Sequence, residues 1–228
     1  MDVSAILISL KTASLSIVFT FVLGVLAAWG VVSMRREHVR AVVDGILTLP
    51  LVLPPTVAGF FLLYIFGIHR PVGSFLLEFF GVRVVFNWWA TVIAATVISF
   101  PLMYRSARGA FEQVDADLLH AGRAIGMSEW RLFRRVVLPM ALPGVASGGI
   151  LAFARGLGEF GATAMIAGNI AGKTRTLPLA VYSAVAAGNM EEAYTYVLIL
   201  VGISFVIVVG LNALTARERR NSGPKDRS

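Results

Sequence analysis

The sequence contains no cysteine and little charge. Without cysteine it can form neither a disulfide bond nor a cysteine-ligated metal site, and His38 and His69 form no ligand cluster with other residues. Charged residues make up 14% of the 228 residues, whereas a soluble domain usually carries about 25%. Hydrophobic residues make up 57%. This balance excludes an ordinary water-exposed surface and predicts a protein that faces lipid.

Five long stretches contain no Asp, Glu, Lys, Arg or His. They are residues 12–34, 45–68, 84–104, 136–154 and 193–216. A helix of roughly 20 apolar residues crosses the hydrocarbon core of a bilayer. The sequence therefore predicts an all-α integral membrane protein with about five transmembrane helices. We expect the fourth span to run from Pro143 to Ile166, because its apolar run begins in a segment that contains proline.

The remaining stretches define the expected domain organisation. Residues 217–228 are charged and contain Gly223-Pro224, so we expect a disordered tail after one transmembrane domain of residues 1–216. Residues 177–185, between the fourth and fifth spans, have an amphipathic pattern. They predict a short helix that lies near the outer surface of the membrane.

The net charge of +7 is distributed unevenly along the chain. If the N-terminus lies outside, residues 35–44, 105–135 and 217–228 face the cytoplasm and hold 14 of the 20 Lys and Arg residues. The outside loops hold five. Basic residues concentrate in the cytoplasmic loops of membrane proteins. The basic charge is therefore a topology signal rather than evidence for nucleic-acid binding, and it predicts an outside N-terminus and a cytoplasmic C-terminus.

The second span contains a proline pair, Pro54-Pro55, followed by Thr56. Proline removes a backbone donor and clashes with the preceding turn, so the pair predicts a broken helix at mid-membrane depth. Irregular backbone at that depth is tolerated where protein or a wet cavity covers it. Two interpretations stay open: a segment that lines the transport path, and a structural kink packed by neighbouring helices.

Arg155 and Glu159 are the only strong charges deep within a predicted span. Ionisable residues in membrane helices are candidates for function. They also stand four residues apart on one helix, where opposite charges can neutralise each other. The pattern is thus consistent with a structural ion pair and with a place in the path of an anion.

Segment 115–139, in the longest predicted cytoplasmic loop, predicts two short helices around a hinge at Gly126. Asp117 is expected to cap the first helix and Ser128 the second. The small residues Ala121 and Gly122 predict a flat face that another protein can approach closely. The alternative is a basic helix that lies on anionic lipid.

Segment 115–139 resembles the coupling motif of ABC importer permeases, Glu-Ala-Ala, three residues, Gly, nine residues, Ile, one residue, Leu-Pro. The matching residues here are Ala121, Gly126, Val136, Leu138 and Pro139. His120 replaces the usual Glu and Gly122 the second Ala, while the spacing is intact. Residues 49–59 and 158–180 are similar to the molybdate and sulfate branch of that family.

The resemblance implies a fold like that of type I ABC importer permeases. In this family two permease copies form a pore, two cytoplasmic ATPase subunits bind below it, and a periplasmic binding protein delivers the substrate. It implies molybdate import by alternating access across the bacterial inner membrane, with sulfate or tungstate as alternatives. An ATP-independent channel or secondary transporter is the alternative from another class. No ATP site or other cofactor is expected in this chain, and an intramembrane enzyme is not expected, since no Cys or His lies within a span.

The resemblance and the residue pattern together assign two groups of site residues. Those expected to couple to the ATPase are Asp117, His120, Ala121, Gly122, Gly126, Trp130, Phe133, Leu138 and Pro139. Those expected along the anion path are Pro54, Pro55, Thr56, Arg155, Glu159, Thr163 and Asn169. The neutral members of this second group, such as the threonines, would bind a divalent anion weakly enough to release it.

Overall fold

The computed structural model describes residues 2–221, and the side chains of residues 2–210 and 213. Within this range every regular element is a helix. The elements are α1 (Val3–Val32), α2 (Glu37–Val52), α3 (Pro55–Phe66), α4 (Pro71–Phe80), α5 (Trp88–Glu112), α6 (Ala116–Ala124), α7 (Glu129–Leu132), the π-helical turn η1 (Phe133–Val137), α8 (Leu138–Leu157), α9 (Gly161–Ala167), α10 (Leu177–Ala186) and α11 (Met190–Asn221).

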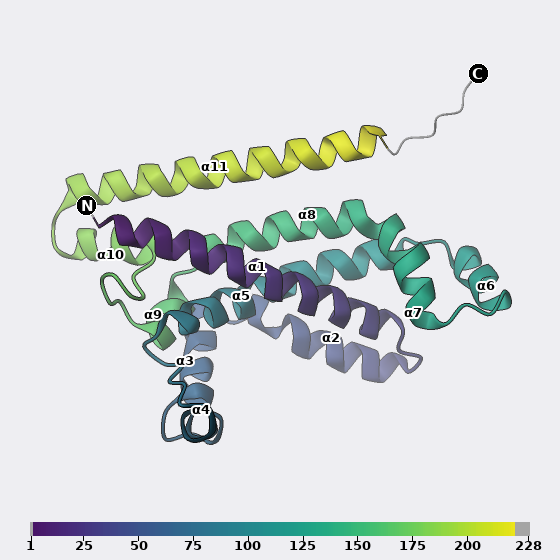
Figure 1. Cartoon of the computed structure of the whole chain (residues 1–228), viewed down its shortest axis with the longest axis horizontal. Helices are drawn as coiled ribbons and strands as arrows, with labels where there is room; N and C mark the ends of the chain where they lie inside the picture. Colours follow the sequence, from purple (N-terminus) through teal and green to yellow (C-terminus); the bar gives the residue numbers. More distant parts are fainter. Residues whose placement is uncertain (1, 222–228) are drawn as a thin grey trace.

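Among the described residues, four helical stretches are long and apolar enough to cross a membrane: α1, α5, the continuous stretch Glu129–Leu157, and Met190–Gly210 of α11. The pair α2 and α3 makes a fifth if it counts as one span, although its two halves are bent by 111° at the break. Figure 1 shows α1, α5, α8 and α11 along the long axis, with the N-terminus and α10 at one end and α6 and α7 at the other. The predicted fold class is confirmed.

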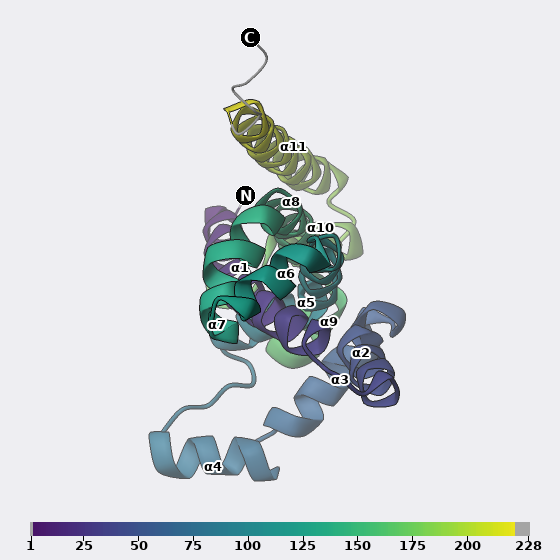
Figure 2. The same cartoon turned by 90° about the vertical axis from the view of Figure 1, so that its right-hand side faces the viewer.

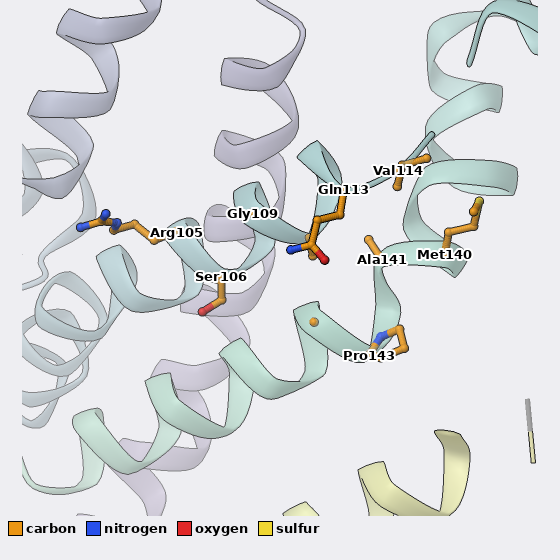
Figure 3. Close-up of a pocket in the computed structure, with 10 residues that line it drawn as sticks. Arg105, Ser106, Gly109, Gln113, Val114, Met140, Ala141 and Pro143 are labelled. Carbon is orange, nitrogen blue, oxygen red and sulfur yellow. The ribbon is translucent and has the colours of Figure 1, made fainter. Parts of the chain in front are cut away.

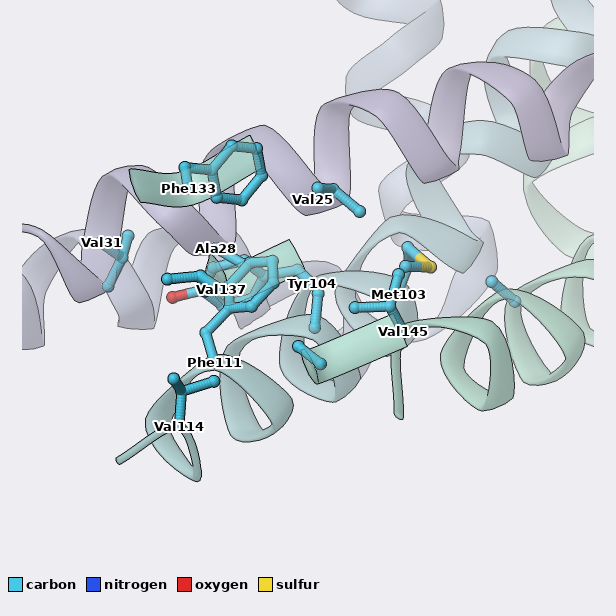
Figure 4. Packing of buried hydrophobic residues seen from close by; sticks show 13 residues of the cluster. Val25, Ala28, Val31, Met103, Tyr104, Phe111, Val114, Phe133, Val137 and Val145 are labelled. Carbon is cyan, nitrogen blue, oxygen red and sulfur yellow. The ribbon is translucent and has the colours of Figure 1, made fainter. Parts of the chain in front are cut away.

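Helices α1, α5 and α8 form the central body of the molecule. Small residues allow close approach: Gly24 of α1 lies against Met103 of α5, and Gly148 of α8 lies against Ser106 of α5. The buried cluster around Met103 and Tyr104 fills the remaining space between the three helices (Figure 4). Small residues at helix contacts are the usual basis of association in membranes, because lipid provides little hydrophobic drive for it.

Two adjacent glycines of α8 allow a matched test of this packing. A Cβ added at Gly148 would lie 2.4 Å from the Cβ of Ser106, whereas a Cβ at Gly149 would meet a ring carbon of Phe21 at 3.6 Å. Overpacking costs about 1–3 kcal/mol, while alanine in a helix gains about 1 kcal/mol over glycine. We expect Gly148→Ala to lower the melting temperature in detergent and Gly149→Ala to keep or raise it. Equal melting temperatures would contradict the close contact of α5 with α8.

The fourth span differs from its predicted bounds. The helix is continuous from Glu129, so Pro143 lies inside α8, and it stops at Leu157 rather than at Ile166. The turn η1 is one residue wider than an α-helical turn, because the Leu138 amide donates to the carbonyl of Phe133, five residues earlier. Pro139 lies just after this turn, and local π-helical adjustments of this kind allow a membrane helix to accommodate a proline.

Two boundaries near the C-terminus also differ. Helix α11 runs past the expected boundary at residue 216 as far as Asn221. The disordered tail stays a prediction, and residues 222–228 lie outside the described residues. The predicted amphipathic helix begins at Leu177 and runs to Ala186 as α10, one residue past its expected end.

Candidate functional site

Two interrupted helices contact each other. The first is the pair α2 and α3, which breaks before Pro55; the second is the pair α8 and α9, which breaks between Leu157 and Gly161. The two breaks touch, because a Cβ added at Gly161 would lie 3.0 Å from the Cβ of Pro55 and 3.1 Å from the amide nitrogen of Thr56. We call this contact, of residues 53–56 with residues 158–162, the helix crossing.

The proline pair causes the first break. Pro55 occupies the first turn of α3 and has no amide to donate, while Leu53 and Pro54 are extended, with ψ angles of 140° and 135°. A residue before proline is pushed away from helical angles, which explains why both residues leave the helix. The predicted break at Pro54-Pro55 is therefore confirmed. Pro54 and Thr56 are exposed and Pro55 is half-buried, so the crossing presents these residues to a surface.

Glu159 stabilises the second break. Its side chain is 2% exposed, and both carboxylate oxygens have partners: Arg155 donates to Oε2 over 2.8 Å, and the Ala162 amide donates to Oε1 over 2.7 Å. Glu159 thus caps α9 and neutralises the guanidinium of Arg155. The ion-pair interpretation of these two residues agrees with this geometry, and Arg155, whose side chain is 33% exposed, still reaches the surface beside the crossing.

The other two predicted path residues lie elsewhere. Thr163 belongs to α9, but its side chain is 1% exposed, so it presents no surface to a path in this structure. Asn169 lies in the loop after α9, where it donates to Ser183 over 2.6 Å and accepts from Arg175 over 2.8 Å. The helix crossing therefore contains Pro54, Pro55, Thr56 and Glu159, and Arg155 is linked to it through its ion pair with Glu159. Thr163 and Asn169 lie outside this group.

Segment 115–139 begins with α6 and a sharp turn at Gly126. The Gly126 φ angle is +79°, and the Met127 amide donates to the Gly122 carbonyl over 3.0 Å, as in a Schellman motif. The predicted hinge is confirmed. The predicted cap is wrong, because Asp115 caps α6 by accepting from the amide of Asp117 over 2.9 Å. Asp115 stands one residue before the helix, which is where an N-cap belongs.

The flat face predicted at Gly122 is covered by the chain itself. A Cβ at Gly122 would lie 2.5 Å from Cδ1 of Leu132 in α7, so this glycine accommodates the next helix rather than another protein. An ion pair from Arg123 to Glu129, with Nε 2.7 Å from Oε1, also joins α6 to α7, and this hydrogen bond raises the pKa of the Arg123 guanidinium. Close approach at Gly122 thus serves internal packing.

The surface that segment 115–139 presents outward carries other residues. Ile125 is 79% exposed, Trp130 59% and Leu118 44%, and His120, Ala121 and Pro139 are exposed as well. We call Leu118, Ile125 and Trp130 the exposed apolar group. Contiguous exposed apolar patches with polar rims mark interaction sites, and these three residues lie within 13 residues of one another in a segment that also exposes polar side chains. Trp130 is thus the predicted coupling residue with the largest exposed apolar side chain.

Phe133, one of the residues expected to couple to the ATPase, is buried inside the chain. It is 2% exposed, and its ring lies 4.9 Å from the ring of Trp29 in α1 and 5.7 Å from that of Phe111 in α5 (centroid distances; Figure 4 shows Phe111 and Phe133). The ring of Trp130 lies 5.5 Å away on its other side. Phe133 therefore joins the exposed segment to the central body, and Leu138 is half-buried behind it.

A pocket of about 530 Å³ lies between α5 and α8, near the end of the molecule that holds segment 115–139 (Figure 3). Its lining includes Ser106, Gly109 and Gln113 of α5 and Met140 and Pro143 of α8. In Figure 3, the Gln113 side chain reaches toward α8, whereas the guanidinium of Arg105 points away from it. No predicted site residue lines this pocket, because its residues come from two helices and follow no sequence motif.

Known proteins resemble this chain along nearly its whole length. Residues 20–220 match the family described as binding-protein-dependent transport system inner membrane component. A Bacillus subtilis protein named putative molybdenum transport system permease protein YvgM is 43% identical over 204 residues, covering 89% of each chain. The Escherichia coli K12 molybdenum transport system permease protein ModB is 40% identical over 220 residues, covering 96% of each.

Among solved structures, a chain of the inward-facing MetNI methionine ABC transporter superposes with a TM-score of 0.73 at 20% identity, covering 95% of both chains. At this identity the likeness concerns the fold alone. Together with the family match and the relatives, it confirms the resemblance inferred from the spacing around Gly126. The chain therefore belongs to the family of binding-protein-dependent transport system inner membrane components, the multi-pass permease subunits of ABC importers.

Proposed function

We propose that this chain forms the transmembrane pathway of an ATP-driven importer for molybdate or a similar tetrahedral oxyanion. The choice of substrate rests on the sequence identity of 40–43% to permeases named for molybdenum transport. Two copies of the chain would enclose the pathway, with two ATPase subunits at the end that holds segment 115–139. A binding protein would deliver the anion at the opposite end.

The helix crossing is the proposed constriction of this pathway. A divalent anion without water cannot enter hydrocarbon, because isolated ions pay tens of kcal/mol by simple solvation estimates. The crossing contains an exposed Thr56 and the carboxylate of Glu159, which balances the charge of Arg155. A balanced cation attracts an anion weakly, and a transport site must release what it binds. Selectivity would then lie mainly in the binding protein.

The exposed apolar group is the proposed docking surface for the ATPase. Leu118, Ile125 and Trp130 belong to α6, α7 and the turn between them. Figure 1 shows α6 and α7 at the end of the molecule opposite α10. The predicted coupling residues with exposed side chains are Asp117, His120, Ala121, Trp130 and Pro139. Gly122, Gly126 and Phe133 would instead fix the shape of the docking surface and its link to α1 and α5.

The proposed orientation can be tested with reporter fusions. The distribution of Lys and Arg predicts that a reporter active only in the periplasm works after Gly81 or Gly172 and is silent after Gln113 or Arg220. Activity after Gln113 would place segment 115–139 outside and would remove it from any cytoplasmic ATPase. The fusions after Gly81 and Gly172 serve as controls for expression and insertion.

Competition distinguishes among the candidate substrates. The complex of the chain with the ATPase that co-purifies with it is reconstituted with its binding protein, and uptake of labelled molybdate is measured. We expect unlabelled molybdate and tungstate to compete, since both are tetrahedral and divalent. If an equal concentration of sulfate competes as strongly as molybdate, the substrate assignment changes to sulfate within the same family.

A further inference from the structure

Helix α2 is attached to the molecule in an unusual way. None of its residues is buried, although it forms the first half of a candidate span. Figure 2 shows it on the flank of the molecule, with α3 and α4 directed away from the body. Its large apolar side chains, such as Val42 and Ile46, are 63% exposed. Only the half-buried Val43 and Leu47 of α2 pack against the central buried cluster, so apolar contacts attach α2 to the rest of the chain over a small area.

A polar cluster joins α2 to α5 instead. Asp44 of α2 accepts a hydrogen bond of 2.7 Å from the hydroxyl of Tyr104 and forms an ion pair with Arg108. Arg108 also donates from Nε to Glu112 over 2.8 Å, and Glu112 pairs with Arg40 of α2. The charges alternate along the series Arg40, Glu112, Arg108 and Asp44, and two of the four come from each helix. We call these four residues and Tyr104 the α2–α5 cluster.

The rigidity of the cluster comes from α5. The Tyr104 residue is fully buried, and its ring is stacked on that of Phe100 with centroids 6.0 Å apart. Arg108 and Glu112 stand four residues apart on the same helix and hold each other in place. Because Tyr104 and Arg108 are held by their neighbours on α5, they form a set of donors into which Asp44 fits. Pairing is needed here, since ionisable groups in membrane spans are costly when they are unpaired.

The cluster also lies between two parts of the proposed transport machinery. Glu112 is the last residue of α5, and Asp115, three residues later, caps α6 at the start of segment 115–139. At its other end, α2 stops at the break before Pro55, which forms the helix crossing with Gly161. A displacement of α5 at the ATPase end would thus act on α2 through Asp44 and Arg40, and α2 would turn about the proline break.

We propose that Asp44 is a positioning residue for transport: it attaches α2 to the end of α5, so that movement of segment 115–139 changes the opening at the helix crossing. This inference rests on the proposed function. It differs from a purely structural role in one prediction. When the attachment is removed, ATP hydrolysis continues but imports less anion for each ATP molecule hydrolysed. The amount of protein in the membrane would stay the same.

The test compares the parental complex with Asp44→Asn in proteoliposomes that contain the co-purifying ATPase and the binding protein. Networks of close residues have coupling energies of 0.5–3 kcal/mol, so we expect the number of ATP molecules hydrolysed per molybdate imported to rise about fivefold or more. Glu37→Gln is the matched control, because Glu37 is an exposed carboxylate at the start of the same helix. Its ratio should equal that of the parent.

A second pair of variants keeps the test decisive if Asp44→Asn inserts poorly. Tyr104→Phe removes one donor to Asp44 and Arg40→Gln removes the outer ion pair, and each should raise the ratio by a smaller factor. Combining Asp44→Ala with Tyr104→Phe should raise it no further than Asp44→Ala alone, because Asp44→Ala already removes the acceptor of the Tyr104 hydroxyl. The proposal is wrong if these variants lower uptake and hydrolysis in proportion, or if the double variant multiplies the single effects. A parental complex that imports no oxyanion would instead refute the proposed function.

Discussion

Replacing Ile125 with aspartate is expected to separate the permease from its ATPase without unfolding the chain. Ile125 is 79% exposed, so its side chain contributes little to the folded monomer. A central apolar residue of an interface often contributes 2 kcal/mol or more, and a buried, unpaired carboxylate adds a further penalty. We expect at least about a tenfold loss of ATPase retained on the purified permease, since 1.4 kcal/mol corresponds to that factor. Uptake should fall with it.

The control for this variant is Ile170→Asp. Ile170 is also an exposed isoleucine outside the helices, but it lies in the loop between α9 and α10, at the end away from segment 115–139. This variant should keep the ATPase at the parental level. If Ile125→Asp also keeps both ATPase and uptake, segment 115–139 is not the docking surface. The alternative that it lies on anionic lipid would then hold.

Replacing Arg155 with methionine is expected to be the most damaging single change at the helix crossing. It leaves the Glu159 carboxylate, which is 2% exposed, without its cation. Removing one partner of a buried pair costs about 3–5 kcal/mol, and the partial exposure of Arg155 places the expected cost near the lower value. We expect a large loss of folded protein, measured as the monodisperse fraction after extraction in detergent.

The double variant Arg155→Met with Glu159→Gln separates structure from transport. Glutamine keeps an oxygen that can accept from the Ala162 amide, so the cap of α9 survives while the unpaired charge disappears. The double variant should therefore recover most of the folded protein. If its uptake recovers too, Arg155 serves the ion pair alone. If folding recovers and uptake does not, Arg155 belongs to the path of the anion.

Features that depend on local backbone chemistry could be predicted from the sequence. The break at Pro54-Pro55 and the turn at Gly126 each follow from what a few neighbouring residues can adopt. The family could be predicted as well, because the spacing from Ala121 to Pro139 is a motif within one segment. The N-cap of α6 is Asp115 and not the predicted Asp117, because aspartate is a favourable N-cap at either position and the sequence alone does not distinguish the two.

Features that depend on how the chain folds back on itself could not be predicted. The small residue Gly122 suggests an open face, but only the path of α7 shows that Leu132 covers it. Asp44 and Arg108 are 64 residues apart, and no periodicity relates them. The helix continues through Pro139 and Pro143, with the π-helical turn η1 directly before α8, whereas the proline rule alone predicts a break.

The central claim is that this permease moves an oxyanion at the expense of ATP hydrolysed by a partner. The most direct test is molybdate uptake by proteoliposomes that contain the permease and its co-purifying ATPase, with loaded binding protein on one side and ATP on the other. We expect uptake that requires both ATP and the binding protein, and vesicles with the permease alone should take up none. Equal uptake by the permease alone, without ATP, would identify an independent channel or secondary transporter and would contradict the account.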